Sequence, residues 1–287
     1  MSSTRHRRLD FRDHRRELWD FEVVYPVISR RARGLSVGLN LNPDKACNFD
    51  CPYCQVDRTG PRRDRAVDLE RLSAELDALL RYVGDGTLWD RPPFDTTAPA
   101  LRVVRDFAFA GDGEPTAFRG FAEAVRRVVA VRDAHGLQEV PINVLTNATL
   151  LHRPAVQEGL RALDAAGGRI WAKLDAGTEA WYQHVDGTTF PWTRVLSNLK
   201  EAALERPIVI QSMWHAFDDA QPGAEERDAW GERLREILEA GGKIALVQVY
   251  SVARRPMDPT VQPLPLAELE DVASRARSLG LTVEVTP

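Results

Sequence analysis

Short apolar runs rich in branched residues alternate with amphipathic segments along most of the chain, beginning near residue 36. Runs of the first kind are typical of buried strands in a parallel sheet, and the amphipathic segments are typical of helices packed against it. The pattern predicts an α/β fold, a partial (β/α)6 TIM-like barrel with a parallel sheet. The expected strands cover residues 36–41, 104–110, 142–146, 170–174, 208–213, 244–250 and 281–285.

The amphipathic segments carry start and stop signals for helices. Asp68 is placed to cap the first helix, and a second is expected to end before Gly136. A third begins at Pro154, where the missing amide hydrogen does no harm. The last, over residues 266–279, is expected to end at Gly280. These signals support about six βα units followed by a closing strand.

The domain organisation follows from the same pattern. Residues 1–34 contain enough apolar side chains to pack on the barrel as an N-terminal extension, and residues 35–287 form the core domain. Residues 84–99 hold several prolines and glycines, so we expect an irregular insertion there rather than a linker between domains. No second core is expected.

Composition and charge exclude several partners. A hydrophobic content of 44% suits a sizeable core, and a net charge of −4 gives no overall attraction to nucleic acid or to an anionic membrane. We expect no membrane partner, since no apolar run is long enough to span a bilayer, and a cytoplasmic location, since no secretory signal core follows the basic start. That basic segment is either an arm that touches phosphates or a solvated terminus.

Three cysteines, Cys47, Cys51 and Cys54, are the only ones in the 287 residues, and they lie within one short loop. Three thiolates can hold three irons of a [4Fe–4S] cluster and leave the fourth iron for a small molecule. Structural zinc takes four protein ligands, and none of the six histidines is spaced to complete such a set. An odd number of close cysteines also does not fit a disulfide framework. The spacing therefore favours an iron–sulfur cluster over zinc.

Polar residues follow the next three expected strands, where ligands gather in parallel α/β folds. Glu114 offers a carboxylate to a cationic amine, although the sequence around it also suits a simple glycine-rich turn. Lys173 suits a carboxylate and Asp175 suits ribose hydroxyls. The full set at these strand ends is Gly111, Asp112, Gly113, Glu114, Thr146, Asn147, Lys173 and Asp175.

The order of these motifs resembles the radical S-adenosylmethionine (radical SAM) superfamily. The cysteine spacing, with Tyr53 just before the last cysteine, is similar to its signature, and Gly113-Glu114-Pro115 resembles its second-strand motif. Segments 39–51, 111–116, 146–151, 173–176 and 247–256 together resemble the wyosine-synthesis-like branch. Enzymes that make the tricyclic wyosine base are expected to carry further cysteines, and this chain has none.

The resemblance implies a function and its cofactors. The three cysteines would hold a [4Fe–4S] cluster, and S-adenosyl-L-methionine (SAM) would be cleaved reductively to a 5′-deoxyadenosyl radical that abstracts hydrogen from an organic or tRNA substrate. A flavodoxin or ferredoxin would supply the electron. The implied cofactor-binding residues are Tyr53, Gly111, Asp112, Gly113, Glu114, Thr146, Asn147, Lys173, Asp175, Gln211, Gln248 and Tyr250.

Substrate and catalytic residues are expected on the loops after the fourth, fifth and sixth strands. The candidates are Tyr182, His184, His215, Arg254 and Arg255, with Asp186 as a further substrate contact. For each of them a structural hydrogen bond is an equally good interpretation. Two alternative functions stay open: an activase that abstracts hydrogen from a glycine of a partner protein, and a noncatalytic iron–sulfur or metal-binding module.

Overall fold

A computed structural model describes residues 20–29, 31–58, 67–254, 256 and 258–287 of the protein. Its centre is an eight-stranded sheet with the order β1-β2-β3-β4-β5-β6-β8-β10. The strands are β1 (Val24–Ser29), β2 (Gly34–Leu39), β3 (Val104–Phe109), β4 (Ile142–Thr146), β5 (Arg169–Lys173), β6 (Ile208–Met213), β8 (Ile244–Tyr250) and β10 (Val283–Thr286). A small separate sheet pairs β7 (His215–Ala216) with β9 (Gln262–Pro263).

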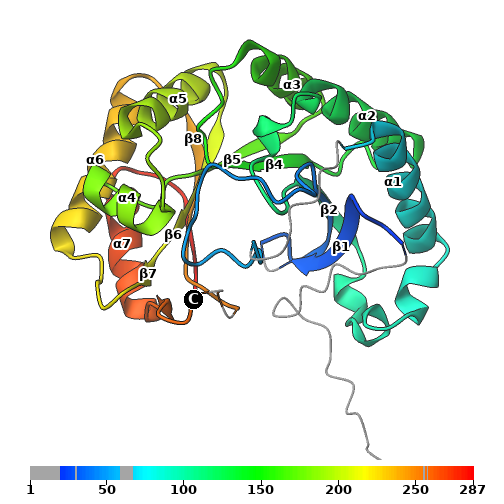
Figure 1. Cartoon of the computed structure of the whole chain (residues 1–287), viewed down its shortest axis with the longest axis horizontal. Coiled ribbons are helices and arrows are strands. Elements are labelled where there is room, and N and C mark those ends of the chain that lie inside the picture. The colour runs from blue at the N-terminus through cyan, green and yellow to red at the C-terminus, as the bar shows by residue number, and fades with distance from the viewer. Residues whose placement is uncertain (1–19, 30, 59–66, 255, 257) are drawn as a thin grey trace, which may run out of the picture.

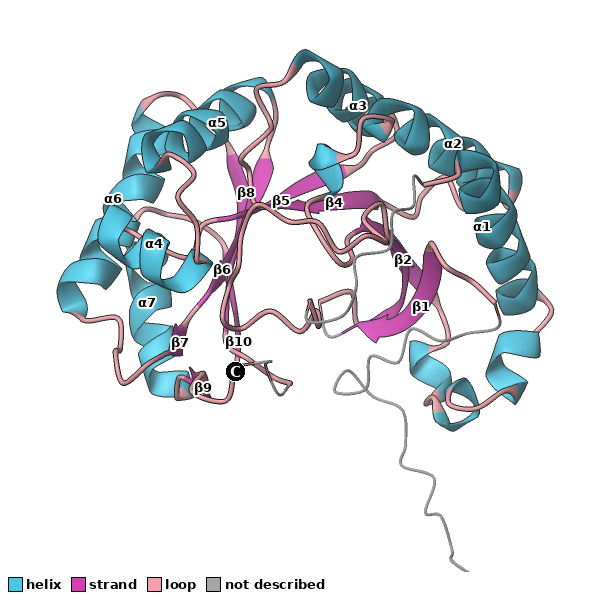
Figure 2. Ribbon diagram, in the orientation of Figure 1, coloured by secondary structure: helices cyan, strands magenta, loops and turns pink. Residues whose placement is uncertain are grey.

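Every neighbouring pair in the large sheet is parallel except β1 with β2. The sheet curves, with its helices arranged as an outer arc (Figures 1 and 2). The two edge strands, β1 and β10, are not hydrogen-bonded to each other, so the described chain forms an open barrel. The predicted α/β fold with a parallel sheet is confirmed.

The four helices whose start or stop signals were named lie where they were predicted, as the first, second, third and last helices of the structure. Asp68 accepts hydrogen bonds from the amides of Glu70 at 2.9 Å and Arg71 at 3.3 Å, which confirms it as the cap of the first helix. The helices are α1 (Leu69–Gly84), α2 (Phe121–Ala134), α3 (Pro154–Ala165), α4 (Glu179–Asp186), α5 (Trp192–Glu205), α6 (Ala224–Glu239) and α7 (Leu266–Ser278). The insertion at 84–99 contains short 3-10 turns, η1 (Thr87–Asp90) and η2 (Phe94–Thr96), and η3 (Pro99–Leu101) begins at its last residue.

The described part of the N-terminal segment contributes a strand to the sheet. Strand β1 pairs with β2 and is fastened to α1 by Glu75, whose buried carboxylate accepts from the amides of Val23 at 2.9 Å and Val24 at 3.0 Å. The ring of Tyr25 lies over Gly38, where any added Cβ would overlap it. Residues 24–29 therefore form an edge of the barrel, a strand that the sequence pattern did not predict.

The two faces of each strand differ in chemistry. On β2, the side chains of Leu35, Val37 and Leu39 are fully buried toward the helices, while Ser36 and Gly38 face the inside of the barrel. This alternation places the apolar core between sheet and helices and leaves the interior lined by small and polar groups. The arrangement positions a polar cavity under the loops at the carboxyl edge.

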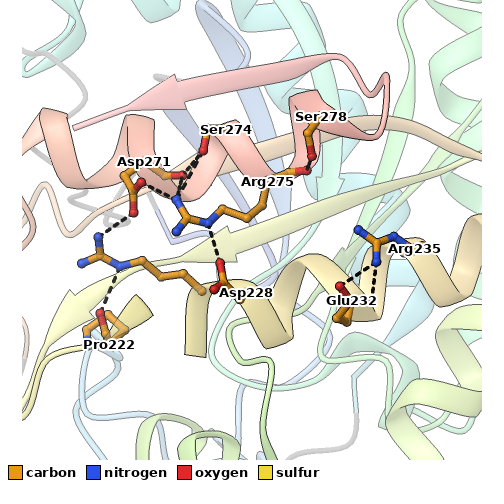
Figure 3. Close-up of polar contacts among 9 residues, drawn as sticks. Pro222, Asp228, Glu232, Arg235, Asp271, Ser274, Arg275 and Ser278 are labelled. Carbon is orange, nitrogen blue, oxygen red and sulfur yellow. Dashed lines mark hydrogen bonds and ion pairs between the residues drawn. The ribbon is translucent and has the colours of Figure 1, made fainter. Parts of the chain in front are cut away.

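Helices α6 and α7 are joined by ion pairs as well as by apolar packing. Arg275 on α7 bonds Asp228 on α6 at 3.0 Å (Figure 3). Arg227 on α6 bonds Glu268 at 2.6 Å and Asp271 at 2.9 Å on α7. These pairs fix the end of the arc that carries β8 and β10. Within the described residues, no helix is both long and apolar enough to cross a bilayer.

Candidate functional site

The cysteine loop follows β2 and lies over the carboxyl edge of the sheet. Its free thiols, Cys47, Cys51 and Cys54, are each partly buried. Asn48 fastens the loop to its neighbours: its side-chain amide donates to Thr149 Oγ1 at 2.8 Å, and its carbonyl oxygen accepts from Thr188 Oγ1 at 2.9 Å. The three thiols are therefore held in place by loops from two other βα units.

Lys173, at the end of β5, lies at the centre of the site. Its Nζ is 2.9 Å from Cys51 Sγ, 2.6 Å from Asp186 Oδ1 and 3.3 Å from Asp175 Oδ2. The same ammonium lies 4.7 Å from the ring centroid of Tyr53, a cation–π distance. The chain itself therefore supplies both carboxylate partners of Lys173. Asp175 comes from the loop after β5, and Asp186 is the last residue of α4.

Burial and charge shift the pKa values of this cluster. Burial raises the pKa of the Cys51 thiol to about 12 despite the neighbouring ammonium. Burial also lowers the pKa of Lys173, but the negative charges of Asp186, Cys51 and Asp175 outweigh it, so the pKa stays well above its usual value. Burial raises the pKa of Asp186 to about 7 although Lys173 opposes the shift. A thiol in this setting becomes a thiolate when a metal replaces its proton.

The donor set fits a cluster held by three thiolates. Two of the thiols have a cation next to them. Lys173 lies beside Cys51, and the Nη1 of Arg58 lies 3.0 Å from the Sγ of Cys54. These cations offset the negative charge that thiolates and a cluster bring. Among the described residues, no three histidine, cysteine or acidic side chains converge on a single metal ion. A cubane does not require such convergence, since each thiolate binds its own iron.

The glycines after β3 lie directly against the cysteine loop. A Cβ at Gly113 would come within 2.0 Å of the carbonyl oxygen of Ala46, and one at Gly111 within 2.3 Å of Asn40 Oδ1. Asp112, between them, accepts from the side-chain amide of Asn40 at 2.8 Å. At Gly113 only glycine allows the two backbones to approach this closely, so residues 111–113 form one wall of the site.

Glu114 is buried and already bonded by protein donors. Its carboxylate accepts from Thr146 Oγ1 at 2.7 Å, from the Asn147 amide at 2.7 Å and from both the amide and the hydroxyl of Thr116. The side chain of Asn147 donates in turn to Asn48 Oδ1 at 2.7 Å. In this geometry the Glu114 carboxylate joins the loops after β3 and β4 to the cysteine loop rather than facing an open pocket.

Asp175 is also engaged by the chain. Its Oδ2 accepts a short hydrogen bond from the hydroxyl of Tyr53, and its Oδ1 accepts from the Met213 amide at 2.8 Å. The Tyr53 ring packs edge-on against His215, with centroids 5.0 Å apart. Asp175 therefore positions the tyrosine of the cysteine loop against the ends of β5 and β6.

A cavity of about 200 Å³ lies inside the barrel, between the edges β1 and β10. Four residues expected at the site line it: Gln211, Gln248, Tyr250 and Arg254. The amides of Gln211 and Gln248 are hydrogen-bonded to each other at 2.8 Å. Arg254 also donates to Gln55 of the cysteine loop at 3.1 Å, so the structure brings this group to the mouth of the cavity.

The remaining candidates lie beside the cysteine loop rather than in the cavity. Tyr182 is buried between Phe49 and Trp192. His184 stacks on Phe217, and its buried Nε2 has no hydrogen-bond partner among the described residues.

His215 is 1% exposed and likewise has no partner there for either ring nitrogen. Burial, Lys173 and His184 lower the pKa of His215 to about 4. Arg255 lies outside the described residues.

Three residues of the site were not predicted in their observed roles. Asp186 was expected only as a substrate contact, yet it pairs with Lys173 and its backbone carbonyl accepts from the Asp50 amide at 3.0 Å. Arg58 and Asn48 were not predicted as site residues at all. The sequence feature that could have identified Arg58 is its position four residues after Cys54. At this spacing its guanidinium reaches the sulfur of Cys54 within the same loop.

The structure defines a class by its fold and its loop: an open α/β barrel with three free thiols on the loop after the first parallel strand. Residues 41–213 match the family described as "Radical SAM superfamily". The protein belongs to the radical SAM superfamily, as its motifs predicted.

The chain is also similar to a curated relative and to two solved structures. A UPF0026 protein of Helicobacter pylori is 25% identical over 192 residues, covering 66% of this chain and 53% of that protein. The chain thus spans about half the length of this curated relative. Streptococcus suis SuiB bound to its precursor peptide SuiA has a TM-score of 0.56 at 14% identity, over 87% of this chain and 48% of SuiB. TYW1 with a lysine-pyruvate adduct bound has a TM-score of 0.53 at 16% identity, covering 86% of this chain and 74% of TYW1. These two likenesses show a shared fold.

Proposed function

We propose that the protein is a radical SAM enzyme that holds a [4Fe–4S] cluster through Cys47, Cys51 and Cys54. The observation that carries the proposal is the placement of three free, partly buried thiols on one loop at the carboxyl edge of the barrel. When bound, the cluster supplies an electron to SAM, giving methionine and a 5′-deoxyadenosyl radical that takes a hydrogen atom from the substrate. The free thiols suit a reducing cytoplasm.

The residues around the thiols prepare the site for a charged cluster. Lys173 and Arg58 place positive charge beside Cys51 and Cys54, where it would offset the negative charge of iron-bound thiolates. Asp175 and Asp186 hold the Lys173 ammonium in position from two sides. The chain therefore supplies both the sulfur ligands and the balancing charge.

The cofactor and the substrate require two further surfaces. The backbone of Gly111 to Gly113 lies against the cysteine loop and supplies polar groups for the methionyl amine, while Glu114, Thr146 and Asn147 keep that wall in place. Gln211, Gln248 and Tyr250 offer amide and phenol groups to the ribose, the adenine or the substrate. Tyr53 and His215 close the site on the side of β6.

The cavity favours a compact reacting group. A volume of about 200 Å³ has room for a compact organic group, which fits a small molecule or a single reacting group of tRNA. The activase stays the alternative, since a glycine of a partner protein is equally compact. Membership of the superfamily and the cavity inside the barrel both favour an enzyme over a noncatalytic metal-binding module.

Anaerobic reconstitution with iron and sulfide, followed by dithionite and SAM, tests the proposal. Chromatography should detect 5′-deoxyadenosine from the wild-type protein. Cys51→Ala should lose both this product and the visible absorbance of the cluster. A wild-type protein that binds the cluster but never cleaves SAM would instead support the noncatalytic module.

A further inference from the structure

A groove lined by basic side chains lies at the starts of α3 and α5. It has a volume of about 490 Å³ and lies between the loop before α3 and the first turn of α5. The lining residues are Leu150, His152, Arg153, Phe190, Pro191, Thr193, Arg194 and Ser197. None of these residues is acidic, so the groove carries positive charge in a chain whose net charge is −4.

Two exposed arginines supply the positive charge of the groove. Arg153 and Arg194 are exposed, and within the described parts of the chain neither guanidinium has an ion pair or a side-chain hydrogen bond. By contrast, Arg126 bonds Glu158 of α3 at 2.8 Å, and Arg206 bonds Asp164 of α3 at 2.6 Å. The charge of the groove is therefore available to an outside partner.

Both walls of the groove are connected to the residue that follows Cys47. One wall begins at Leu150, next to Thr149, which accepts from the Asn48 side chain at 2.8 Å. The other includes Phe190, whose amide donates to Thr188 Oγ1, and that hydroxyl donates to the Asn48 carbonyl. A partner seated in the groove would be separated from Cys47 only by Asn48 and its hydrogen-bond partners.

We propose that this groove is the docking surface for a small acidic protein that carries one electron. This inference rests on the proposed function, which requires an external electron for each cleavage of SAM. The step transfers one electron from the reduced carrier to the oxidised cluster, and no bond forms or breaks. Charge complementarity steers the encounter, and Phe190 and Pro191 supply the apolar contact.

The number of basic side chains in the groove favours such a carrier over nucleic acid. Electron-transfer complexes use small interfaces, below about 1,200 Å². Nucleic-acid binding commonly neutralises about six to ten phosphates, and the groove offers two arginines and one histidine. The number of charges therefore fits an acidic patch on a protein better than a phosphate backbone.

The test uses the anaerobically purified holoprotein, flavodoxin as the probe and the double variant R153E/R194E. Flavodoxin binding, measured by calorimetry at low and high salt, should weaken at least about tenfold at low salt in this variant and lose most of its salt dependence. Reduction of the cluster by flavodoxin hydroquinone should slow by a similar factor. Reduction by dithionite, and the 5′-deoxyadenosine formed with it, should be unchanged.

The matched control is R161E/R169E, which changes the net charge equally at two exposed arginines away from the groove, in the second half of α3 and at the start of β5. It should bind flavodoxin like the wild type. Equal effects of both double variants, or none from R153E/R194E, would overturn the proposal. So would a loss of tRNA binding in R153E/R194E with flavodoxin binding unchanged. Failure of the proposed function would look different, because dithionite would then yield no 5′-deoxyadenosine from the wild-type protein.

Discussion

The Nζ of Lys173 lies 2.9 Å from the Sγ of Cys51, although 122 residues separate them in the chain. This contact joins the end of β5 to the cysteine loop after β2. The lysine in turn is held by Asp186 and Asp175, both nearly inaccessible to solvent. One ammonium group thus serves as the balancing charge for a thiol and two carboxylates.

Replacing this ammonium should destabilise the fold. Lys173→Met leaves Asp175 and Asp186 without their counter-charge, and breaking a buried ion pair in this way costs about 3–5 kcal/mol. Urea unfolding of the cluster-free protein at neutral pH measures the loss. The double variant Lys173→Met/Asp186→Asn should be less destabilised than the single one, because one stranded charge is removed. If both variants unfold at the same urea concentration, the ion pair is not what Lys173 contributes.

A substitution at Gly113 tests the close approach of residues 111–113 to the cysteine loop. Gly113→Ala places a methyl group 2.0 Å from the carbonyl oxygen of Ala46, so the loop that carries Cys47 must shift. We expect a loss of about 1–3 kcal/mol of stability and a clear drop in bound iron per chain after reconstitution. Gly84→Ala is the control, since nothing lies within 4 Å of its added Cβ. Equal iron contents in the two variants would contradict this role.

His215 should give the protein a distinct pH dependence. Its pKa is lowered from 6.5 to about 4, chiefly by burial, so the unfolded chain takes up a proton at a higher pH than the folded one. Stability therefore falls as the pH drops below about 6.5, and the loss levels off below about 4. Between about pH 7.5 and pH 5, the cluster-free wild type should lose about 2 kcal/mol more than His215→Phe.

The phenylalanine variant keeps an aromatic ring against Tyr53 and removes only the titration. Urea midpoints of both proteins at the two pH values give the comparison. Parallel pH profiles for wild type and variant would show that His215 titrates alike in the folded and unfolded chains.

Much of the fold was predictable from the sequence. Strands at 142–146, 208–213 and 244–250 have the predicted bounds, because buried parallel strands appear as unbroken apolar runs between turn signals. Strand β1 was missed because Pro26 interrupts its run, and proline is tolerated there since β1 is an edge strand.

The site was predictable in its location and less so in its bonding. The thiols and the polar strand ends do gather at one edge, as the parallel topology requires. The partners of Glu114 were not predictable, because the sequence does not reveal that Thr146 and the Asn147 amide satisfy its carboxylate. The pairing of Lys173 with Asp186 likewise depends on where α4 ends, which local patterns do not specify.

Electron paramagnetic resonance of the dithionite-reduced, reconstituted protein, recorded with and without SAM, tests the central claim most directly. Three sulfur ligands leave one iron open, so SAM should bind it and change the spectrum of the reduced cluster. Wild-type protein is expected to show this change, and Cys51→Ala is expected to show no cluster signal. A spectrum that SAM leaves unchanged, or a purified protein holding zinc in place of iron, would contradict the account.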